Sequence, residues 1–398
     1  MTEASQTRRV VESARAIGFE LCGVAPAAEF EELRRLPEWL ERGYAGEMRY
    51  LHDARRASAE TVLPGARSVI VCALNYNAPQ PCSTAKDDAG AAVHDEAKSR
   101  GPRGWISRYA WGDDYHDVMK RKLDELAAWM RAEFGGAFRA RAYVDTGPVL
   151  ERVAAKYAGL GWLAKNTCLI HQRLGSWLFL GVILTDLELA PSLPRGETPP
   201  DLCGSCRRCI DACPTEAFVA PYVLDARRCI AYLTIELRGP IPEEFRPAMG
   251  NMVFGCDICQ DVCPWNRKAP VTRIAEFLPR TIRENNGGAS AEQEHARRGT
   301  AGESLFAPAL EWLISLNEEE FRKVFRGSPM KRTKWRGLIR NACVALGNSQ
   351  LAPGNPAYGR VAARLEQLAA SEDALIAEHA RWALSRLGVK RSDAHRAD

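Results

Sequence analysis

The sequence of 398 residues lacks the features that would assign it to several common classes of protein. No apolar run approaches the length of a membrane span. There is no G-x-G-x-x-G motif at a strand-to-helix turn and no Walker A lysine, so neither a nicotinamide site of the Rossmann type nor a P-loop is supported. Charge of one sign is also scarce: 54 Lys and Arg against 50 Asp and Glu leave a formal charge of +4, which is too small by itself to indicate a nucleic-acid partner.

We also expect no export signal. Arg8 and Arg9 form a pair near the start, but the residues after them are amphipathic, and no apolar core or cleavage site follows. Cysteine, in contrast, is plentiful, with 13 residues. Five of them fall in apolar runs or an irregular loop without a pairing pattern, as reduced thiols do, so we expect a cytoplasmic protein with no membrane partner. These five are Cys22, Cys72, Cys82, Cys168 and Cys343.

The other eight cysteines form two groups between residues 203 and 263. The first group follows C-x2-C-x2-C-x3-C-P, the pattern of bacterial ferredoxins, and ends at Cys213 and Pro214. The second group is a C-x2-C-x3-C-P that ends at Cys263 and Pro264. Cys229 stands alone between the groups and is the candidate for the missing thiolate. Eight thiolates in this arrangement predict two [4Fe-4S] clusters.

The spacing also predicts which thiolates share a cluster. In the ferredoxin pattern three cysteines of one loop bind one cluster, and the fourth, at the start of the next helix, binds the other. The alternatives are a zinc ribbon, which needs only four such ligands, and a disulfide framework, but eight cysteines with Pro after both terminal ones exceed what zinc requires. Cluster 1 is predicted to bind Cys203, Cys206, Cys209 and Cys263, and cluster 2 to bind Cys213, Cys229, Cys256 and Cys259.

Hydrophobic periodicity predicts a mixed α/β (α+β) domain over residues 1–190. Continuous apolar runs at 68–76 and 177–184 are typical of strands buried on both faces, and 19–24 and 141–145 predict two further strands. Helices are predicted over 5–18, from a cap at Asp113 or Asp114 to about Phe134, and from Pro148 to Leu160.

Residues 191–284 hold the cysteine groups and predict a ferredoxin-like domain with two clusters. The segments 78–104 and 285–302 are rich in Gly, Ala, Ser or charge and predict a mobile loop and a linker. Residues 303–398 predict a helical tail. Within the tail, two eight-residue segments match at an offset of 41, the spacing of HEAT-type helical pairs. These segments are 340–347 and 381–388.

The tail also carries a basic stretch. Residues 322–340 include eight Lys and Arg and no Asp or Glu. Such a composition on the edge of a helical repeat suits a phosphate backbone. The alternative is an ordinary solvated helix face.

Asp145 is the titratable residue that the pattern singles out. It follows a predicted buried strand and precedes Thr-Gly-Pro, at the carboxyl end of a strand, where open α/β sheets commonly bind ligands. In an enclosed site desolvation would raise the carboxyl pKa, and the group could donate a proton near neutral pH. The alternative is that Asp145 caps the helix that starts near Pro148.

Five segments carry a resemblance that covers nearly the whole chain. With the two cysteine groups, they resemble the epoxyqueuosine reductase family. The resemblance implies that the chain reduces the epoxide of epoxyqueuosine at the wobble position of certain tRNAs to queuosine, the last step of queuosine biosynthesis. It also implies a cobalamin in the first domain that receives electrons through the two clusters, and a HEAT-like tail that helps to hold tRNA. The segments are 144–152 (VDTGPVLER), 159–167 (GLGWLAKNT), 175–177 (GSW), 255–266 (GCDICQDVCPWN) and 327–332 (GSPMKR).

The resemblance implies roles for individual residues. Asp145 matches the family's proton donor, which protonates the departing oxygen, and the modified base would be flipped into the first domain for the reaction. Electrons are expected from an external low-potential donor protein. The implied cobalamin contacts are Arg56, Arg108, Tyr109, Asp145, Asn166, Ser176 and Asp257, and the implied tRNA contacts are Lys331, Arg332, Lys334, Arg336 and Arg340.

Two other classes of protein stay open at this point. A reductive dehalogenase resembles this architecture of cobalamin and two clusters, but it would normally carry an export signal and would have no use for a basic helical tail. A ferredoxin-like electron carrier or assembly factor would bind neither a corrinoid nor tRNA, and a carrier does not need the α/β domain of residues 1–190. We expect the protein to be a monomer.

Overall fold

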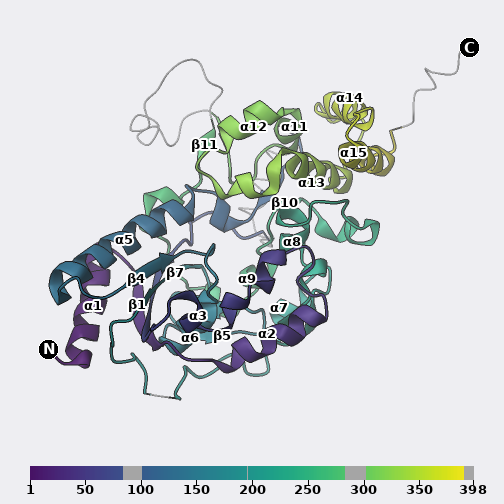
Figure 1. Ribbon diagram of the computed structural model, residues 1–398. Helices are drawn as coiled ribbons and strands as arrows, with labels where there is room; N and C mark the ends of the chain where they lie inside the picture. The colour runs from purple at the N-terminus through teal and green to yellow at the C-terminus, as the bar shows by residue number, and fades with distance from the viewer. Residues whose placement is uncertain (84–100, 195, 283–301, 390–398) are drawn as a thin grey trace, which may run out of the picture. The chain divides into compact units, whose positions relative to one another are not determined.

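The computed structural model describes residues 1–83, 101–194, 196–282 and 302–389. The chain forms two compact units (Figure 1). The cysteine-rich segment contributes residues to both of them. Unit 1 comprises Met1–Pro79, Asp113–Arg227 and Ile258–Leu278, and unit 2 comprises Gln80–Gly112, Arg228–Asp257 and Pro279–Asp398.

Unit 1 is built on an antiparallel four-stranded sheet in the order β1-β2-β7-β4. The central strand β2 (Ser68–Asn75) is buried along its whole length, as its continuous apolar run predicts. Strand β7 (Leu178–Thr185) lies beside it, and β1 (Leu21–Pro26) and β4 (Ala140–Tyr143) form the edges. The four predicted strands are therefore confirmed, with small shifts at their ends. Because the neighbouring strands are antiparallel, the mixed architecture is of the α+β kind.

Helices cover both faces of this sheet. On one face, α1 (Glu3–Ile17) and α5 (Tyr115–Phe134) pack against each other and against the strands. Gly181 of β7 allows α5 to approach closely, because a Cβ atom there would lie 2.7 Å from the Leu123 side chain. The opposite face is covered by α6 (Glu151–Tyr157).

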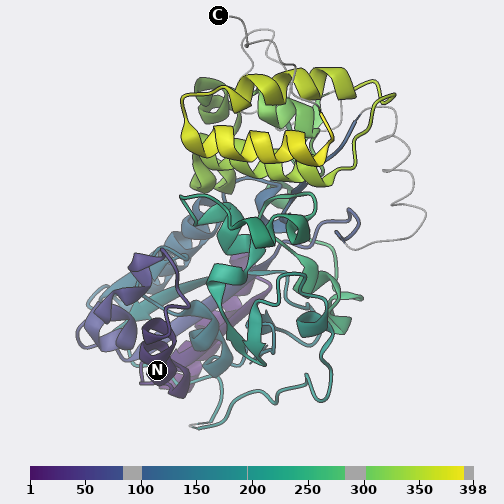
Figure 2. The ribbon, with the colours of Figure 1, turned by 90° about the vertical axis from the view of Figure 1, so that its right-hand side faces the viewer.

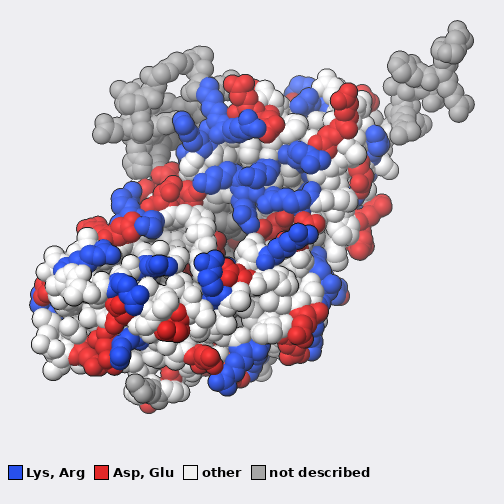
Figure 3. Space-filling view, viewed as in Figure 1, with Lys and Arg blue, Asp and Glu red and all other residues white. Residues whose placement is uncertain are grey.

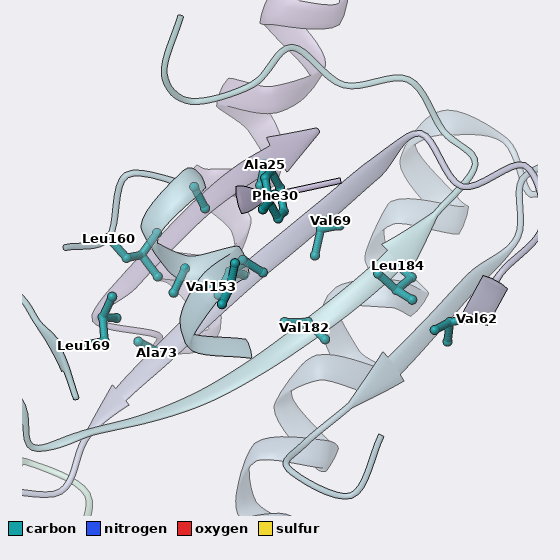
Figure 4. Close-up of a cluster of buried hydrophobic side chains, with 14 of the residues drawn as sticks. Ala25, Phe30, Val62, Val69, Ala73, Val153, Leu160, Leu169, Val182 and Leu184 are labelled. Carbon is teal, nitrogen blue, oxygen red and sulfur yellow. The ribbon is translucent and has the colours of Figure 1, made fainter. Parts of the chain in front are cut away.

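The core of unit 1 lies between α6 and the sheet (Figure 4). Val69, Val182 and Leu184 point from the two central strands toward Val153 of α6 and Leu160 just beyond it. Valine and isoleucine suit such strands because a β-branched side chain packs well on a pleated surface. This packing fixes where β4 ends and where α6 begins, and these are the two ends of the loop that carries Asp145.

The remaining elements of unit 1 and its boundary are short. They are α2 (Glu31–Glu41), α3 (Ala59–Val62), α7 (Arg208–Asp211), α9 (Ile258–Asp261), the 3-10 turns η1 (Arg49–His52), η2 (Ala54–Ala57), η4 (Ala226–Arg228), η7 (Pro264–Asn266) and η8 (Ala275–Phe277), and the strand pairs β5 (Trp162–Leu163) with β6 (Leu169–Ile170) and β8 (Phe218–Ala220) with β9 (Val223–Leu224).

Unit 2 is mainly helical. Its strands pair in parallel between β3 (Trp105–Ile106) and β10 (Met252–Phe254) and antiparallel between β11 (Thr281–Ile282) and β12 (Glu303–Ser304). The helices are α8 (Ile230–Ile235), α11 (Leu310–Ser315), α12 (Glu318–Val324), α13 (Lys334–Asn348), α14 (Tyr358–Ala369) and α15 (Ala374–Arg386), and the 3-10 turns are η3 (Arg108–Ala110), η5 (Glu243–Phe245), η6 (Pro247–Met249) and η9 (Pro329–Thr333).

Helix α13 is central to unit 2, since every residue from Gly337 to Gly347 is buried. It packs against α8, α11, α15 and β10, and the tail helices run alongside one another in Figure 2. Gly347 lies against α15, because a Cβ atom there would be 3.1 Å from the Cα atom of Ala383. Both residues belong to the segments that match at an offset of 41. A HEAT-like layout of the whole tail stays a prediction.

The predicted domain boundaries at 190, 284 and 302 also stay predictions. Most of the predicted mobile loop at 78–104 and of the linker at 285–302 lies outside the described residues. At the described end of the first segment, Arg103 forms a β-bridge with Ala309 and an ion pair with Glu303 (2.8 Å). Among the described residues, no helix is both long enough and apolar enough to cross a bilayer.

Candidate active site

The predicted ligands of cluster 1 gather in unit 1. Cys203 and Cys206 precede α7, Cys209 lies within it, and Cys263 follows α9, which packs against α7. Burial raises the pKa of the Cys263 thiol to about 11, and the neighbouring charges of Cys209 and Cys203 contribute to the shift. Three of the four predicted thiols therefore influence one another directly.

Apolar side chains surround this group of thiols. Trp162, Ile170 and Cys263 belong to one buried cluster, and Cys203 and Trp265 pack against it. Free thiolates would be costly to bury here. An iron–sulfur cluster that binds the deprotonated sulfur atoms neutralises their charge, so metal binding and deprotonation are coupled. The arrangement therefore fits the predicted [4Fe-4S] cluster 1.

The predicted ligands of cluster 2 are divided between the units. Cys213 and Cys259 belong to unit 1, where the sulfur of Cys213 accepts a hydrogen bond from the backbone N–H of Ala217 (3.3 Å). Cys229 and Cys256 belong to unit 2, at the N-cap of α8 and just after β10. This ligand set stays a prediction. Within the described ranges, no three His, Cys, Asp or Glu side chains converge as the ligands of one metal ion would.

Asp145 lies on the loop between β4 and α6, with its backbone in the left-handed region (φ +56°). Strand β4 is an edge strand and is only partly buried. The prediction that a buried strand precedes Asp145 is therefore wrong. The loop is held by Arg56, which donates to the carbonyl oxygen of Val149 (3.3 Å). Leu150 is the N-cap of α6, and no side chain caps the helix. The predicted helix start at Pro148 is therefore wrong, and so is the alternative role of Asp145 as its cap.

The carboxylate of Asp145 contacts the first turn of α5. Its Oδ2 atom accepts a hydrogen bond from the Tyr115 hydroxyl (3.0 Å) and lies 3.7 Å from Nε2 of His116. The other ring nitrogen of His116, Nδ1, lies 2.6 Å from Oδ1 of Asp114, which also caps α5 by accepting from the backbone N–H of His116 (3.2 Å). Asp114 is 2% exposed, whereas the Asp145 side chain is 69% exposed. The buried carboxylate of Asp114, the imidazole of His116 and the exposed carboxylate of Asp145 thus lie next to one another in space.

The charges in this group decide its protonation states. Neighbouring protein atoms desolvate the carboxylate of Asp145, which raises the pKa, but the contact with His116, the hydrogen bond from Tyr115 and the charges of His116 and Arg152 lower the pKa by more. Desolvation lowers the pKa of His116, but its contacts with Asp114 and Asp145 raise that pKa to about 9. The expected raised pKa of Asp145 is therefore wrong for this arrangement. At neutral pH the proton resides on the imidazole.

Glu151, the first residue of α6, is a functional candidate that the sequence interpretation missed. Its Oε1 atom is buried and has no hydrogen-bond partner among the described residues. Desolvation raises the pKa of Glu151 to about 7, the charge of Asp145 adds to the shift, and Arg56 and Arg152 oppose it. Its place in the same 144–152 segment as Asp145 is the signal that could have found it.

The variant Glu151→Gln is expected to reduce the pH dependence of the free energy of unfolding. The pKa of this carboxyl group is about 4.5 in the unfolded chain and about 7 in the folded protein. Its stabilising contribution is therefore complete below about pH 4.5 and is lost as the pH rises through about 7. Urea unfolding at about pH 5 and about pH 8 measures the difference. The exposed Glu12→Gln serves as the control, and an unchanged pH dependence in Glu151→Gln would contradict the raised pKa.

The other predicted cobalamin contacts of unit 1 hold backbone segments in place. Asn166 is 3% exposed and donates to the carbonyl oxygen of Cys259 (3.3 Å). Ser176 is 5% exposed, and its hydroxyl accepts from the side-chain amides of Gln260 and Asn266 (2.9 Å each). Both residues therefore tie the loops around β6 to the second cysteine group.

The predicted contacts in unit 2 have a similar role. Asp257 is 2% exposed and accepts hydrogen bonds from the Ser107 hydroxyl, from Nε1 of Trp105 (3.2 Å) and from the backbone N–H of Arg108 (2.7 Å). Arg108 is equally buried, whereas Tyr109 is only partly buried. Asp257 and Arg108 therefore support the backbone of unit 2 around η3, and Tyr109 is the more accessible of the three side chains.

The predicted tRNA contacts divide into exposed residues and one buried residue. Lys and Arg gather on the face of unit 2 shown in Figure 3. Two of the exposed arginines are partly neutralised, since Arg332 pairs with Glu236 (2.8 Å) and Arg336 pairs with Asp373. The exposed residues, which lie on η9 and the first turn of α13, are Lys331, Arg332, Lys334 and Arg336.

Arg340 is wrong as a predicted tRNA contact. It is 1% exposed, and its guanidinium group donates to the carbonyl oxygens of Leu233 (2.6 Å), Leu237 (2.9 Å) and Gly239 (2.7 Å) and to the side chain of Asn341. Carbonyl groups at the end of a short helix have no partner within the helix. Arg340 donates to one such carbonyl group in α8 and to two in the segment just after it. It is therefore a structural residue of unit 2.

Comparison with known proteins bears on both the cysteine groups and the Asp145 loop. A family model described as epoxyqueuosine reductase QueG, DUF1730, matches residues 56–146, and one described as a 4Fe-4S double cluster binding domain matches residues 202–266. The epoxyqueuosine reductase of Xanthomonas campestris pv. campestris is 39% identical over 96% of each chain. That of Gloeobacter violaceus is 44% identical over 87% of this chain and 97% of the relative.

Solved structures of epoxyqueuosine reductases are also similar to this chain over nearly its whole length. A crystal structure of an epoxyqueuosine reductase with an epoxyqueuosine-modified tRNA-Tyr stem loop covers 97% of this chain and 91% of its own, with 28% identity and a TM-score of 0.78. A Bacillus subtilis epoxyqueuosine reductase, in which a catalytic aspartate loop is swung out of the active site, covers 97% and 100%, with 26% identity and a TM-score of 0.73. The double-cluster model supports two [4Fe-4S] clusters over a zinc ribbon or a disulfide framework.

Proposed function

The chain belongs to the epoxyqueuosine reductase family, and from this membership we propose that it reduces the epoxide of epoxyqueuosine at the wobble position of tRNA to give queuosine. The observation that carries the proposal is the identity of 39% to a curated epoxyqueuosine reductase over 96% of both chains. A relative of this fold binds a tRNA stem loop with the modified base. Because the substrate is a tRNA, we place the reaction in the cytoplasm.

We assign the electron path to the two clusters. The proposed ligands are those predicted from the cysteine spacing, and the gathering of Cys203, Cys209 and Cys263 supports cluster 1. An external low-potential protein supplies the electrons, and the enzyme acts as a monomer. Cobalamin, when bound, supplies electrons at a carbon atom, a reaction that no side chain can perform. In unit 1, Asn166 and Ser176 would hold the backbone around it.

Asp145 is the proposed proton donor to the epoxide oxygen. Its carboxyl group is exposed on a loop, and Tyr115 and His116 orient it from α5. The Bacillus subtilis relative also carries a catalytic aspartate on a loop. A carboxyl proton transferred to the oxygen as the carbon–oxygen bond breaks avoids the formation of a free alkoxide.

Replacing Lys331 and Lys334 together with alanine is expected to weaken tRNA binding about tenfold at physiological salt, with a salt slope that falls by about 2. Lys331 on η9 and Lys334 at the start of α13 are both exposed, and each would neutralise a phosphate and release a counterion. Filter binding or fluorescence anisotropy over a salt series measures both quantities. Arg8→Ala with Arg15→Ala on α1 removes the same charge elsewhere. An equal loss in that control would contradict a specific contact.

The experiment that tests the function is anaerobic reconstitution of the chain with iron, sulfide and cobalamin, followed by turnover of tRNA bearing epoxyqueuosine with a chemical reductant. Mass spectrometry of the digested nucleosides detects queuosine. We expect queuosine with the complete protein and none when cobalamin is left out. If cobalamin binds without queuosine formation, another substrate of a corrinoid reductase replaces epoxyqueuosine. If cobalamin does not bind, the protein is an electron carrier.

A further inference from the structure

We propose that His116 supplies Asp145 with the protons that Asp145 passes on during each turnover, so that Asp114, His116 and Asp145 form one proton relay that ends at the epoxide oxygen. This inference rests on the proposed function. It adds a proton source to that function, and the source is a residue that does not itself touch the substrate. Its support is the stoichiometry of the reaction together with the geometry at the start of α5.

The stoichiometry requires two protons at one oxygen atom. An epoxide becomes an alkene when both carbon–oxygen bonds break, two electrons from the reduced donor enter the new carbon–carbon double bond, and the oxygen leaves as water. The first proton converts the opened epoxide oxygen to a hydroxyl group, and the second lets this hydroxyl group leave as water. A single carboxyl group holds one proton. Because Asp145 is a carboxylate in the resting protein, it must take up a proton before each of the two transfers.

The geometry places an imidazole next to Asp145 for this purpose. Nε2 of His116 lies 3.7 Å from Oδ2 of Asp145, and Nδ1 lies 2.6 Å from Oδ1 of Asp114. The second contact fixes the ring, since a carboxylate at Nδ1 holds a proton there and directs Nε2 toward Asp145. The ring also stacks on Tyr115 (4.1 Å between centroids), which stacks on Phe179 of β7 (4.4 Å). The ring is therefore held with Nε2 facing Asp145, and a small approach of the exposed carboxylate, or one water between the two groups, completes the path for the proton.

The charges around His116 keep that proton available. Asp114 and Asp145 both face the ring and raise the pKa of His116 to about 9. The charge of Arg152 on α6 lowers the pKa of Asp145. Glu151, also on α6, lies near enough to Asp145 to feel its charge. From β7 the contact to this group is the apolar ring of Phe179 by way of Tyr115.

The direction of transfer follows from basicity. In the resting protein the proton stays on His116, because the pKa of Asp145 is lowered. The oxygen of an opening epoxide becomes far more basic than either group, so the carboxylate of Asp145 takes the proton of His116 and passes it to the oxygen. The His116 side chain is 31% exposed, so solvent returns a proton to Nε2 after each of the two transfers.

His116→Gln tests the relay because glutamine fills similar space but carries no titrating proton. Wild-type single turnover is expected to stay level to about pH 8.5, whereas the variant should fall about 100-fold or more at pH 8 and less than about tenfold at pH 5.5, where solvent can protonate Asp145. His116→Ala should recover activity with added imidazole. His52→Gln removes an exposed imidazole elsewhere in unit 1 and should leave the profile unchanged.

A second readout does not depend on turnover. Histidine NMR titration of the cluster-loaded full chain, with the signal identified by its loss in His116→Gln, should place this imidazole well above the ordinary range, and Asp145→Asn should lower its pKa. If wild type forms queuosine but His116→Gln keeps the wild-type pH profile, or if imidazole does not rescue His116→Ala, the relay is wrong and the function stands. If wild type forms no queuosine, the function fails and the relay fails with it, whatever the titration shows.

Discussion

The variant Cys209→Ala is expected to bind about four iron atoms per chain instead of about eight, and to lose turnover by a factor on the order of 10³ or more, because electrons no longer reach the site where the substrate is reduced. Cys209 is one of the proposed ligands of cluster 1. Its thiol is close to two others, because its charge raises the pKa of Cys263 and the charge of Cys203 raises the pKa of Cys209. Iron and sulfide analysis after anaerobic reconstitution, with electron paramagnetic resonance of the reduced protein, measures cluster content. Turnover of modified tRNA measures the activity.

Cys168→Ser is the matched control. Cys168 influences the pKa of Cys263, so it is near the same thiols, but it lies outside both cysteine patterns. The control is expected to keep about eight iron atoms and most of its turnover. The assignment would be contradicted if Cys209→Ala kept the full iron content or if Cys168→Ser lost as much as Cys209→Ala. The first result would remove Cys209 from the ligands of cluster 1, and the second would favour Cys168 as a ligand.

Local patterns explain what could be predicted from the sequence. The strand β2 was predictable because a strand covered by helices on both faces needs apolar side chains on both, and this leaves a continuous run. The start of α5 was predictable because Asp114 caps it through a hydrogen bond between near neighbours. The iron–sulfur domain was predictable because a cubane cluster requires cysteines at fixed short spacings, and a 4Fe-4S double cluster model matches residues 202–266.

Contacts between distant segments explain what could not be predicted. Tyr115 and Asp145 are 30 residues apart in the sequence, so the lowered pKa of the carboxyl group follows only from the folded chain. Proline suggested a helix from Pro148, yet the loop continues to Leu150, which is the N-cap of α6. The basic stretch did not reveal that Arg340 faces the interior, because composition does not tell which side of a helix meets the core.

The variant Asp145→Asn is expected to lower turnover about 10³-fold at every pH, while tRNA and cobalamin bind within about threefold of wild type. Asparagine has the shape of aspartate, and its carbonyl oxygen can still accept the hydrogen bond from Tyr115. It has no carboxyl proton to give to the departing oxygen. The measurements are single turnover across the pH range, tRNA affinity by anisotropy, and cobalamin uptake by absorbance. Asp124→Asn on the exposed side of α5 is the control, because it removes a carboxylate that pairs with Lys120.

The pH profile separates this variant from His116→Gln. Loss of the proton donor itself cannot be compensated by acid, so Asp145→Asn stays slow at low pH, whereas a variant that lacks only the supply of protons recovers there. Turnover of Asp145→Asn within threefold of wild type would contradict Asp145 as the donor. Since the imidazole of His116 is the next acid in the row, at 3.7 Å from Asp145, that result would require the proton to reach the oxygen from His116 without passing through a carboxyl group.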